Sequence, residues 1–140
     1  MGFDLSKDTY FGGAAMTGQE IKAGIAELSL ESHNFISSLV YKNDENSTLD
    51  RPFETIGNAY RFAFSLGYSK GIREKLSVPK KDIGVRGFRP EEFKVLVEKE
   101  CIEENLSLGA LISEYAESGS KELSKCIGAG ENILQLLDPK

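Results

Sequence analysis

The chain has 140 residues, of which 40% are hydrophobic, and its formal net charge at pH 7 is −5. This length fits one domain that buries roughly two-thirds of its unfolded surface on folding. No run of about 18 apolar residues is available to span a bilayer, and the N-terminus lacks the basic and apolar regions of a secretion signal. The sequence therefore predicts a cytoplasmic protein without a membrane partner.

The charges are distributed unevenly along the chain. Residues 51–90 contain nine Lys or Arg and three Asp or Glu, whereas residues 1–50 contain three against eight and residues 91–140 five against eleven. The middle third is thus +6 between flanks of −5 and −6. Because a local field steers an anionic ligand more than the overall charge does, the middle third is the first candidate for a binding surface.

The N-terminal part is expected to form an arm followed by a helix. Residues 1–16 mix aromatic and polar side chains around two glycines, which indicates an ordered, extended arm, and residues 17–140 are expected to form one helical domain. Thr17 and Glu20 have the spacing of a capping box, and an apolar stripe at helical spacing follows. This pattern predicts a long helix over residues 18–42.

The densest apolar run extends from residue 52 to residue 76. Apolar side chains at helical spacing from residue 53 to 66 cover almost every side, which predicts a core helix at the centre of the fold. Gly67 stands where a left-handed C-terminal cap is usual, so residues 69–76 are expected to form a second, short cationic helix.

The remaining segments complete an all-α fold of about five helices. Residues 78–90 predict a basic loop, either irregular throughout or containing a brief strand, and Pro90 predicts the start of a helix over residues 91–105. Ser107 is expected to cap a further helix that ends at Ser118-Gly119, and a last helix is expected to begin near Ser120.

The chain contains no recognisable catalytic or metal-binding motif. It lacks a Walker loop, a GxSxG, an HExxH and a Rossmann fingerprint. Its single histidine, His33, is interpreted as a helix residue, and no usual zinc set can be assembled from it. For Cys101 and Cys126 two buried thiols are expected, with a disulfide as the alternative. The sequence predicts a non-enzymatic protein without metal or cofactor.

The candidate binding residues are the seven cations between residues 70 and 89, which only two acids oppose. Such a cluster can neutralise several phosphates of a nucleic acid. The alternative is that these cations pair with the acidic helices of the same chain or of a second subunit. The seven candidates are Lys70, Arg73, Lys75, Lys80, Lys81, Arg86 and Arg89.

Two stretches, FETIGNAYRFAFSLGYSKGIREKL and LISEYAESGSKEL, resemble small accessory proteins associated with Dnd-type DNA phosphorothioation and restriction loci. The similar features are an aromatic residue that opens the helix, an apolar stretch ending in LGY, a following G-x-R and a later EYA-x-x-G turn. The resemblance covers residues 52–76 and 108–123. It implies a non-catalytic, DNA-associated accessory or regulatory protein of a prokaryotic or viral DNA-modification or defence system, and it includes no active-site residue.

A second function remains open from the residues alone. The chain can instead be a protein–protein interaction module, an adaptor or inhibitor, whose basic middle binds the acidic surface of a protein partner. Such a module is expected to be homo-oligomeric and not to bind nucleic acid.

Overall fold

The structure, a computed structural model, describes residues 21–130 except 42–45, 47, 49–50 and 85. The described residues are mostly helical, as predicted, but they form four α-helices, one 3-10 helix and a small two-stranded sheet. The predicted N-terminal arm, the Thr17–Glu20 capping box and the chain after Gly130 lie outside them. The elements in order are β1 (Glu27–Ser29), α1 (Leu30–Ser37), α2 (Ile56–Lys70), β2 (Lys80–Asp82), η1 (Pro90–Phe93), α3 (Lys94–Glu104) and α4 (Leu108–Gly128).

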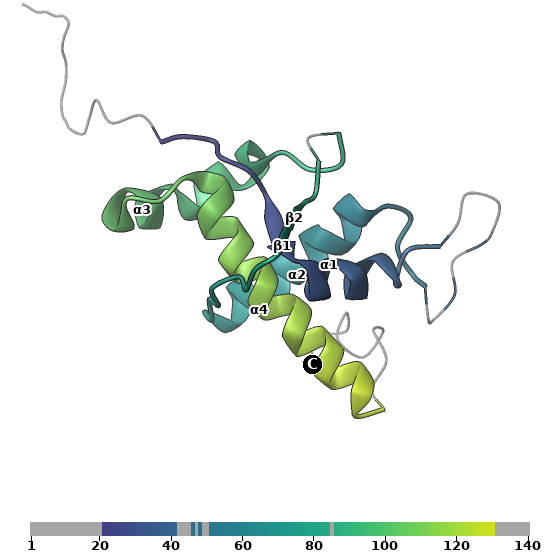
Figure 1. Cartoon of the computed structure of the whole chain (residues 1–140). Helices are drawn as coiled ribbons and strands as arrows, with labels where there is room; N and C mark the ends of the chain where they lie inside the picture. The colour runs from purple at the N-terminus through teal and green to yellow at the C-terminus, as the bar shows by residue number, and fades with distance from the viewer. Residues whose placement is uncertain (1–20, 42–45, 47, 49–50, 85, 131–140) are drawn as a thin grey trace, which may run out of the picture.

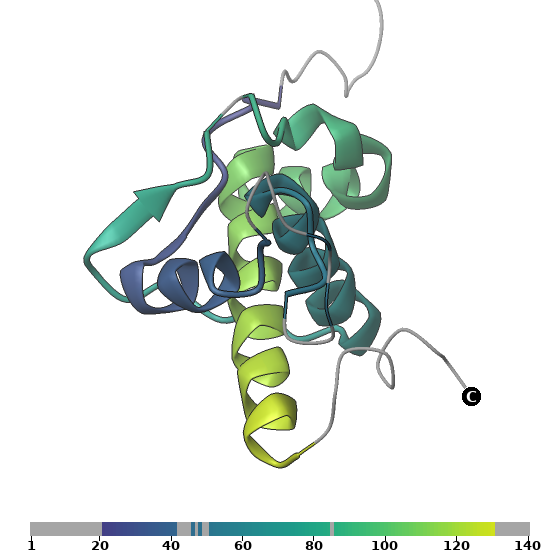
Figure 2. The same cartoon turned by 90° about the vertical axis from the view of Figure 1, so that its right-hand side faces the viewer.

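Helix α4 runs through the centre of the molecule (Figure 1). It contacts β1, α1, η1, α2 and α3, and its packing against α2 is the most extensive in the fold. Figure 2 shows the sheet and α1 on one side of α4 and α2 on the other. The prediction that residues 53–66 form a core helix is confirmed from Ile56 onward, since Ala59, Tyr60, Ala63 and Phe64 are buried. The prediction that this helix is the centre is corrected, because α4 takes that position.

Two glycines that were predicted to end helices lie inside them. Gly67 is buried within α2 and Gly119 within α4, where the two helices cross. A Cβ on Gly67 would overlap the Tyr115 carbonyl, and a Cβ on Gly119 would overlap the Ala63 carbonyl. These glycines therefore permit close helix contact. No separate helix forms over residues 69–76, and the helical segment predicted from Ser120 is present to Gly128, but as the continuation of α4 and not as a helix of its own. Helix α2 ends instead at Gly71, which has φ of 67°.

The predicted helix over residues 18–42 is also wrong over most of its described part. Residues 21–26 are irregular, β1 follows, and only α1 is helical. The Lys22 and Ala23 carbonyls accept hydrogen bonds from the Leu108 and Gly109 amides at 2.9 and 2.7 Å. These bonds and the pairing of β1 with β2 hold the segment extended against its helical pattern, so tertiary contacts override local preference.

The second half of the chain decides one open alternative and confirms the predicted cap of α4. Residues 80–82 form the brief strand β2, which pairs antiparallel with β1 so that Leu28 lies opposite Lys81. Ser107 caps α4, since its hydroxyl accepts from the Ala110 amide at 3.1 Å. Pro90 does begin a helical segment, although its first turn is the 3-10 helix η1. In the described ranges, no helix combines the length and apolar character needed to cross a membrane.

Candidate nucleic-acid interface

The seven predicted binding residues fall into two groups in the structure. Lys70 and Arg73, at the end of α2 and just after it, are engaged by acids of the chain's own helices. Lys70 Nζ lies 3.7 Å from Glu122 Oε2 on α4. Arg73 is placed among three carboxylates of α3 and α4. For these two residues the alternative of internal pairing is correct.

Arg73 joins three parts of the fold. Its Nη2 donates to Glu104 Oε1 at 2.6 Å, its Nη1 lies 3.2 Å from Glu100 Oε2, and its Nε lies 3.7 Å from Glu114 Oε1. The hydrogen bond to Glu104 raises the pKa of the Arg73 guanidinium further above its ordinary value. A planar guanidinium with several donors suits such a multiple contact. Arg73 is therefore a structural residue that ties the chain after α2 to α3 and α4.

The other five cations are exposed: Lys75, Lys80, Lys81, Arg86 and Arg89. None of them takes part in an ion pair within the residues that the structure describes. The last four lie on β2 and the loop that follows it, and we call Lys80, Lys81, Arg86 and Arg89 the basic edge. Lys81 also lies near His33 of α1, where burial first and the Lys81 charge second lower the pKa of the histidine.

Alternating burial places the cations of the basic edge on the surface. Ile83 and Phe88 are buried, and the cations stand before, between and after these two anchors. The Phe88 ring packs edge-on against Tyr60, with ring centroids 4.8 Å apart. Gly84, with φ of 93°, makes the turn between them, and its carbonyl accepts from the Phe88 amide at 3.2 Å. The loop is therefore fixed to the core by its apolar side chains.

Helix α2 holds the same loop from the other side. A Cβ on Gly57 would overlap the Gly87 carbonyl, so the helix backbone lies directly against the loop. Arg61 of α2 lies over the Phe88 ring at 5.4 Å and also binds Glu92 through both carboxylate oxygens, at 2.9 and 2.8 Å. That hydrogen bond lowers the pKa of the Glu92 carboxyl. Arg61 is thus another cation of the middle third whose charge is paired with a carboxylate of the same fold.

The basic edge is better suited to binding phosphate groups than to catalysing a reaction. The basic edge presents four cations in ten residues on a short strand and an anchored loop. Lys and Arg side chains that are free of internal partners can exchange counterions for phosphate oxygens without breaking contacts in the fold. Only phosphate contacts are supported by this arrangement, and these position a nucleic acid without reading its sequence.

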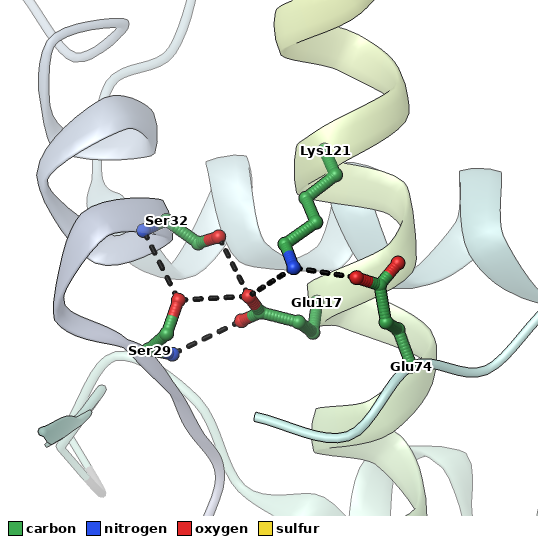
Figure 3. Close-up of polar contacts among 5 residues, drawn as sticks. All are labelled: Ser29, Ser32, Glu74, Glu117 and Lys121. Atoms are coloured by element: carbon green, nitrogen blue, oxygen red, sulfur yellow. Dashed lines mark hydrogen bonds and ion pairs between the residues drawn. The ribbon is translucent and has the colours of Figure 1, made fainter. Parts of the chain in front are cut away.

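The sequence reasoning missed a buried carboxylate on α4. Glu117 is fully buried, and Figure 3 shows it pointing from α4 toward the start of α1. Its Oε1 accepts from the Ser29 amide at 3.0 Å, and its Oε2 accepts from the hydroxyls of Ser29 and Ser32 at 2.7 and 2.9 Å. Lys121, one turn further along α4, lies 3.7 Å from Glu117 and also binds Glu74. Every oxygen of this carboxylate has a partner, so the cluster is a structural anchor.

No sequence signal marked that cluster, because Glu117 and the two serines that bind it are 85 or more residues apart. A similar long-range contact lies deeper in the core, where the Ser113 hydroxyl donates to the Gly109 carbonyl at 2.6 Å and accepts from the Glu27 amide at 2.8 Å. The Tyr60 hydroxyl lies 3.3 Å from the same oxygen. Burial raises the pKa of Tyr60 well above its ordinary value, so this hydroxyl stays protonated.

The described residues offer no group of three His, Cys, Asp or Glu side chains that could hold a metal ion. A hollow of about 480 Å³ lies between the extended segment after residue 20 and the turn from α3 to α4, and its lining includes Cys101 and Ser107. The Cys101 thiol is buried, its pKa is raised by that burial, and it contacts the Ser107 carbonyl at 3.6 Å. This inert thiol is not joined to Cys126, and none of the hollow's lining residues belongs to the basic edge.

No protein-family model matches this chain, and neither the curated proteins nor the solved structures include a significant match to it.

Proposed function

We propose that the protein is a non-catalytic accessory or regulatory component that contacts the phosphates of a nucleic acid through the basic edge, Lys80, Lys81, Arg86 and Arg89. The observation that supports this most is the contrast inside one basic segment. Lys70 and Arg73 are paired internally, while the basic edge is exposed and has no ion-pair partner among the described residues. Lys75 is exposed as well, in the chain between α2 and β2.

The resemblance to accessory proteins of Dnd-type systems supports DNA as the polyanion. On that basis we place the protein in the cytoplasm, within a prokaryotic or viral DNA-modification or defence system. Its contribution there is binding, since the basic edge combines cations with neither a nucleophile nor a set of metal ligands. A surface of this kind adds salt-dependent affinity to a larger assembly whose other members supply specificity and chemistry.

A protein-interaction module remains the second candidate, and one observation favours it. Helix α3 exposes Val95, Leu96 and Ile102, which are large apolar side chains without cover from the described residues. Isolated apolar side chains are common on protein surfaces, but a group on one short helix is typical of a contact site. The two functions are compatible, because α3 and the basic edge are separate elements.

The test of phosphate binding is a fluorescence-anisotropy titration of labelled duplex and single-stranded DNA of about 30 nucleotides, at about 50 and about 200 mM salt. We expect binding that weakens steeply with salt. In the variant Lys80→Gln/Lys81→Gln/Arg86→Gln/Arg89→Gln the dependence of log K on log salt should flatten by up to about four units. Absent or salt-insensitive binding by the wild-type protein would overturn the proposal.

A matched pair of double variants separates the basic edge from a general charge effect. Arg86→Gln/Arg89→Gln removes two charges from the basic edge, and Arg51→Gln/Lys125→Gln removes two exposed charges elsewhere. We expect the first variant to lose affinity and the second to bind nearly as the wild type does. Equal losses in both would show that net charge, and not this surface, governs binding.

A further inference from the structure

The two edges of the ribbon formed by β1 and β2 differ in what covers them. On the β1 edge the backbone amides point away from β2 toward α4. The Glu27 amide donates to the Ser113 hydroxyl at 2.8 Å, and the Ser29 amide donates to the Glu117 carboxylate at 3.0 Å. Helix α4 therefore covers the β1 edge with side-chain acceptors. Figure 2 shows β2 on the other side of the ribbon, away from α4.

The β2 edge carries backbone groups without partners in the described part of the chain. The residues that flank β2 both bond across the ribbon, since the Pro79 carbonyl accepts from the Leu30 amide at 2.9 Å and the Ile83 amide donates to a carbonyl beside β1 at 3.0 Å. Bonding direction alternates along an antiparallel strand, so Lys80 and Asp82 direct their N–H and C=O groups away from β1. No described residue bonds these groups, and all three residues of β2 are exposed.

We propose that β2 binds an extended acidic segment of a protein partner, which adds to the ribbon as a further strand antiparallel to β2. The free edge presents both donors and acceptors, and an added peptide strand satisfies both. A phosphate group offers acceptor oxygens alone and leaves the free carbonyls unpaired. Strand addition does not depend on nucleic-acid binding, but its site includes Lys80 and Lys81 of the basic edge. The two ligands therefore exclude each other.

The charges of β2 select an acidic segment. Lys80 and Lys81 are neighbours on the strand, so their side chains point to opposite faces of the ribbon. Neither lysine forms an ion pair with a described residue. The carboxylate of Asp82 already accepts from the Gly84 amide in its own turn. An added strand thus meets a cation on each face, and two adjacent acidic residues opposite the lysines form two cross-strand pairs.

A second copy of β2 fits the same edge less well. The register that pairs all the free groups of residues 80 and 82 has its two-fold axis at Lys81. The two Lys81 side chains then lie directly opposite each other, and like charges in that position destabilise a sheet. Lysine on an edge strand protects against self-pairing in this way. The same lysines attract an acidic strand, so the charge favours a different chain as the occupant.

A peptide with methylated backbone nitrogens tests strand addition on the unaltered protein. The probe is fluorescein-labelled Thr-Thr-Thr-Glu-Glu-Thr-Thr-Thr-amide, and we expect a Kd between about 10 μM and about 1 mM at about 50 mM salt. With the two Glu opposite Lys81 and Lys80, the second Glu and the Thr before the first Glu direct their amides at β2. Methylating these two nitrogens should weaken binding at least about tenfold.

The matched control peptide is methylated on the first Glu and on the Thr after the second Glu. It has the same charge and the same number of methyl groups, but its methylated nitrogens face away from β2. We expect it to bind within about threefold of the unmethylated peptide. No binding of the unmethylated peptide up to about 2 mM, equal affinities of the two methylated peptides, or the opposite preference would overturn the proposal.

Charge reversal tests the selection of an acidic segment. Lys80→Glu/Lys81→Glu should bind the Glu-Glu peptide at least about tenfold more weakly and bind the matching Lys-Lys peptide better than the wild type does. Arg51→Glu/Lys125→Glu reverses two exposed charges elsewhere and should bind the Glu-Glu peptide within about threefold of the wild type. Equal losses in the two variants would contradict a site on β2.

Hydrogen exchange and competition separate strand addition from nucleic-acid binding. Saturating Glu-Glu peptide should displace duplex DNA and slow the amide hydrogen exchange of Lys80 and Asp82, measured by NMR, whereas DNA should leave that exchange nearly unchanged. Equal slowing by DNA would contradict strand addition. A protein that binds DNA but not the peptide would contradict strand addition alone, and one that binds the peptide but not DNA would contradict the proposed function alone.

Discussion

At the scale of single residues, the polar groups of the core contribute more to the stability of the fold than the exposed charges do. Glu117 brings a carboxylate into the interior, and three donors from residues 29 and 32 compensate its lost hydration. Because Ser29 is both the N-cap of α1 and the last residue of β1, the carboxylate fixes the point where strand becomes helix. Removing one partner of a buried, fully paired group is destabilising, because the groups left behind stay buried without compensation.

We therefore expect Glu117→Gln to lower the free energy of unfolding by about 2–4 kcal/mol. The side chain keeps its shape, but an NH2 group replaces one carboxylate oxygen and then faces either the Ser29 amide or the two hydroxyls and Lys121. Urea unfolding measures the change. Glu122→Gln is the matched control on the same helix, since Glu122 pairs with Lys70 at 3.7 Å in a partly exposed site and its loss should cost less than about 1 kcal/mol. Similar losses in both variants would show that burial of Glu117 has no special role.

At the scale of elements, several helix ends were predictable from the sequence, but three segments were predicted incorrectly. These are the described part of residues 18–42, residues 69–76 and the helix break near Ser120. The Ser107 cap and the core helix from Ile56 were predictable, because caps and apolar spacing are local signals, whereas a brief strand within residues 78–90 was only one of two alternatives. Residues 27–29 were predicted to be helical, and they form a strand because β2, some 50 residues away, supplies the partner. No local pattern contains that information.

The glycines Gly67 and Gly119 show a different limit. In sequence each follows an apolar run, which is where a helix usually ends. In the structure each is helical and uses the absence of a side chain to bring α2 and α4 together. Local sequence cannot distinguish these two uses of glycine. The same applies to the candidate site, because the seven cations were identified together, whereas only the packing shows which of them have carboxylate partners.

The crossing of α2 and α4 predicts a large effect of one methyl group. Gly119→Ala places a Cβ against the Ala63 carbonyl, so we expect a loss of stability of about 2 kcal/mol or more despite the better helix propensity of alanine. Gly128→Ala is the control at the end of the same helix, where a Cβ meets no atom of the described residues within 4 Å. That variant should be as stable as the wild type or slightly more stable. Thermal unfolding of the two variants tests the close crossing, and a stable Gly119→Ala would contradict it.

At the scale of the whole molecule, the positive charge of the middle third has a structural role in the fold and the proposed role in binding phosphate. Acids of α3 and α4 hold Arg73 and Lys70, so part of the positive middle third neutralises the acidic last third inside one fold. The basic edge lies on the strand and loop that these acids do not reach, according to the ion pairs of the described residues. The proposed function therefore divides one basic segment into a structural part and a phosphate-binding part.

Stability and DNA affinity, measured together on two variants, test that division most directly. Arg73→Gln breaks contacts to three carboxylates, so its melting temperature should fall by about 3–8 °C, which corresponds to about 1–2 kcal/mol, while DNA affinity measured at low temperature stays close to that of the wild type. Lys80→Gln/Lys81→Gln/Arg86→Gln/Arg89→Gln should melt within about 2 °C of the wild type and lose most of its salt-dependent affinity. The reverse result, a four-fold variant that is unstable and an Arg73→Gln protein that is stable but fails to bind, would contradict the account.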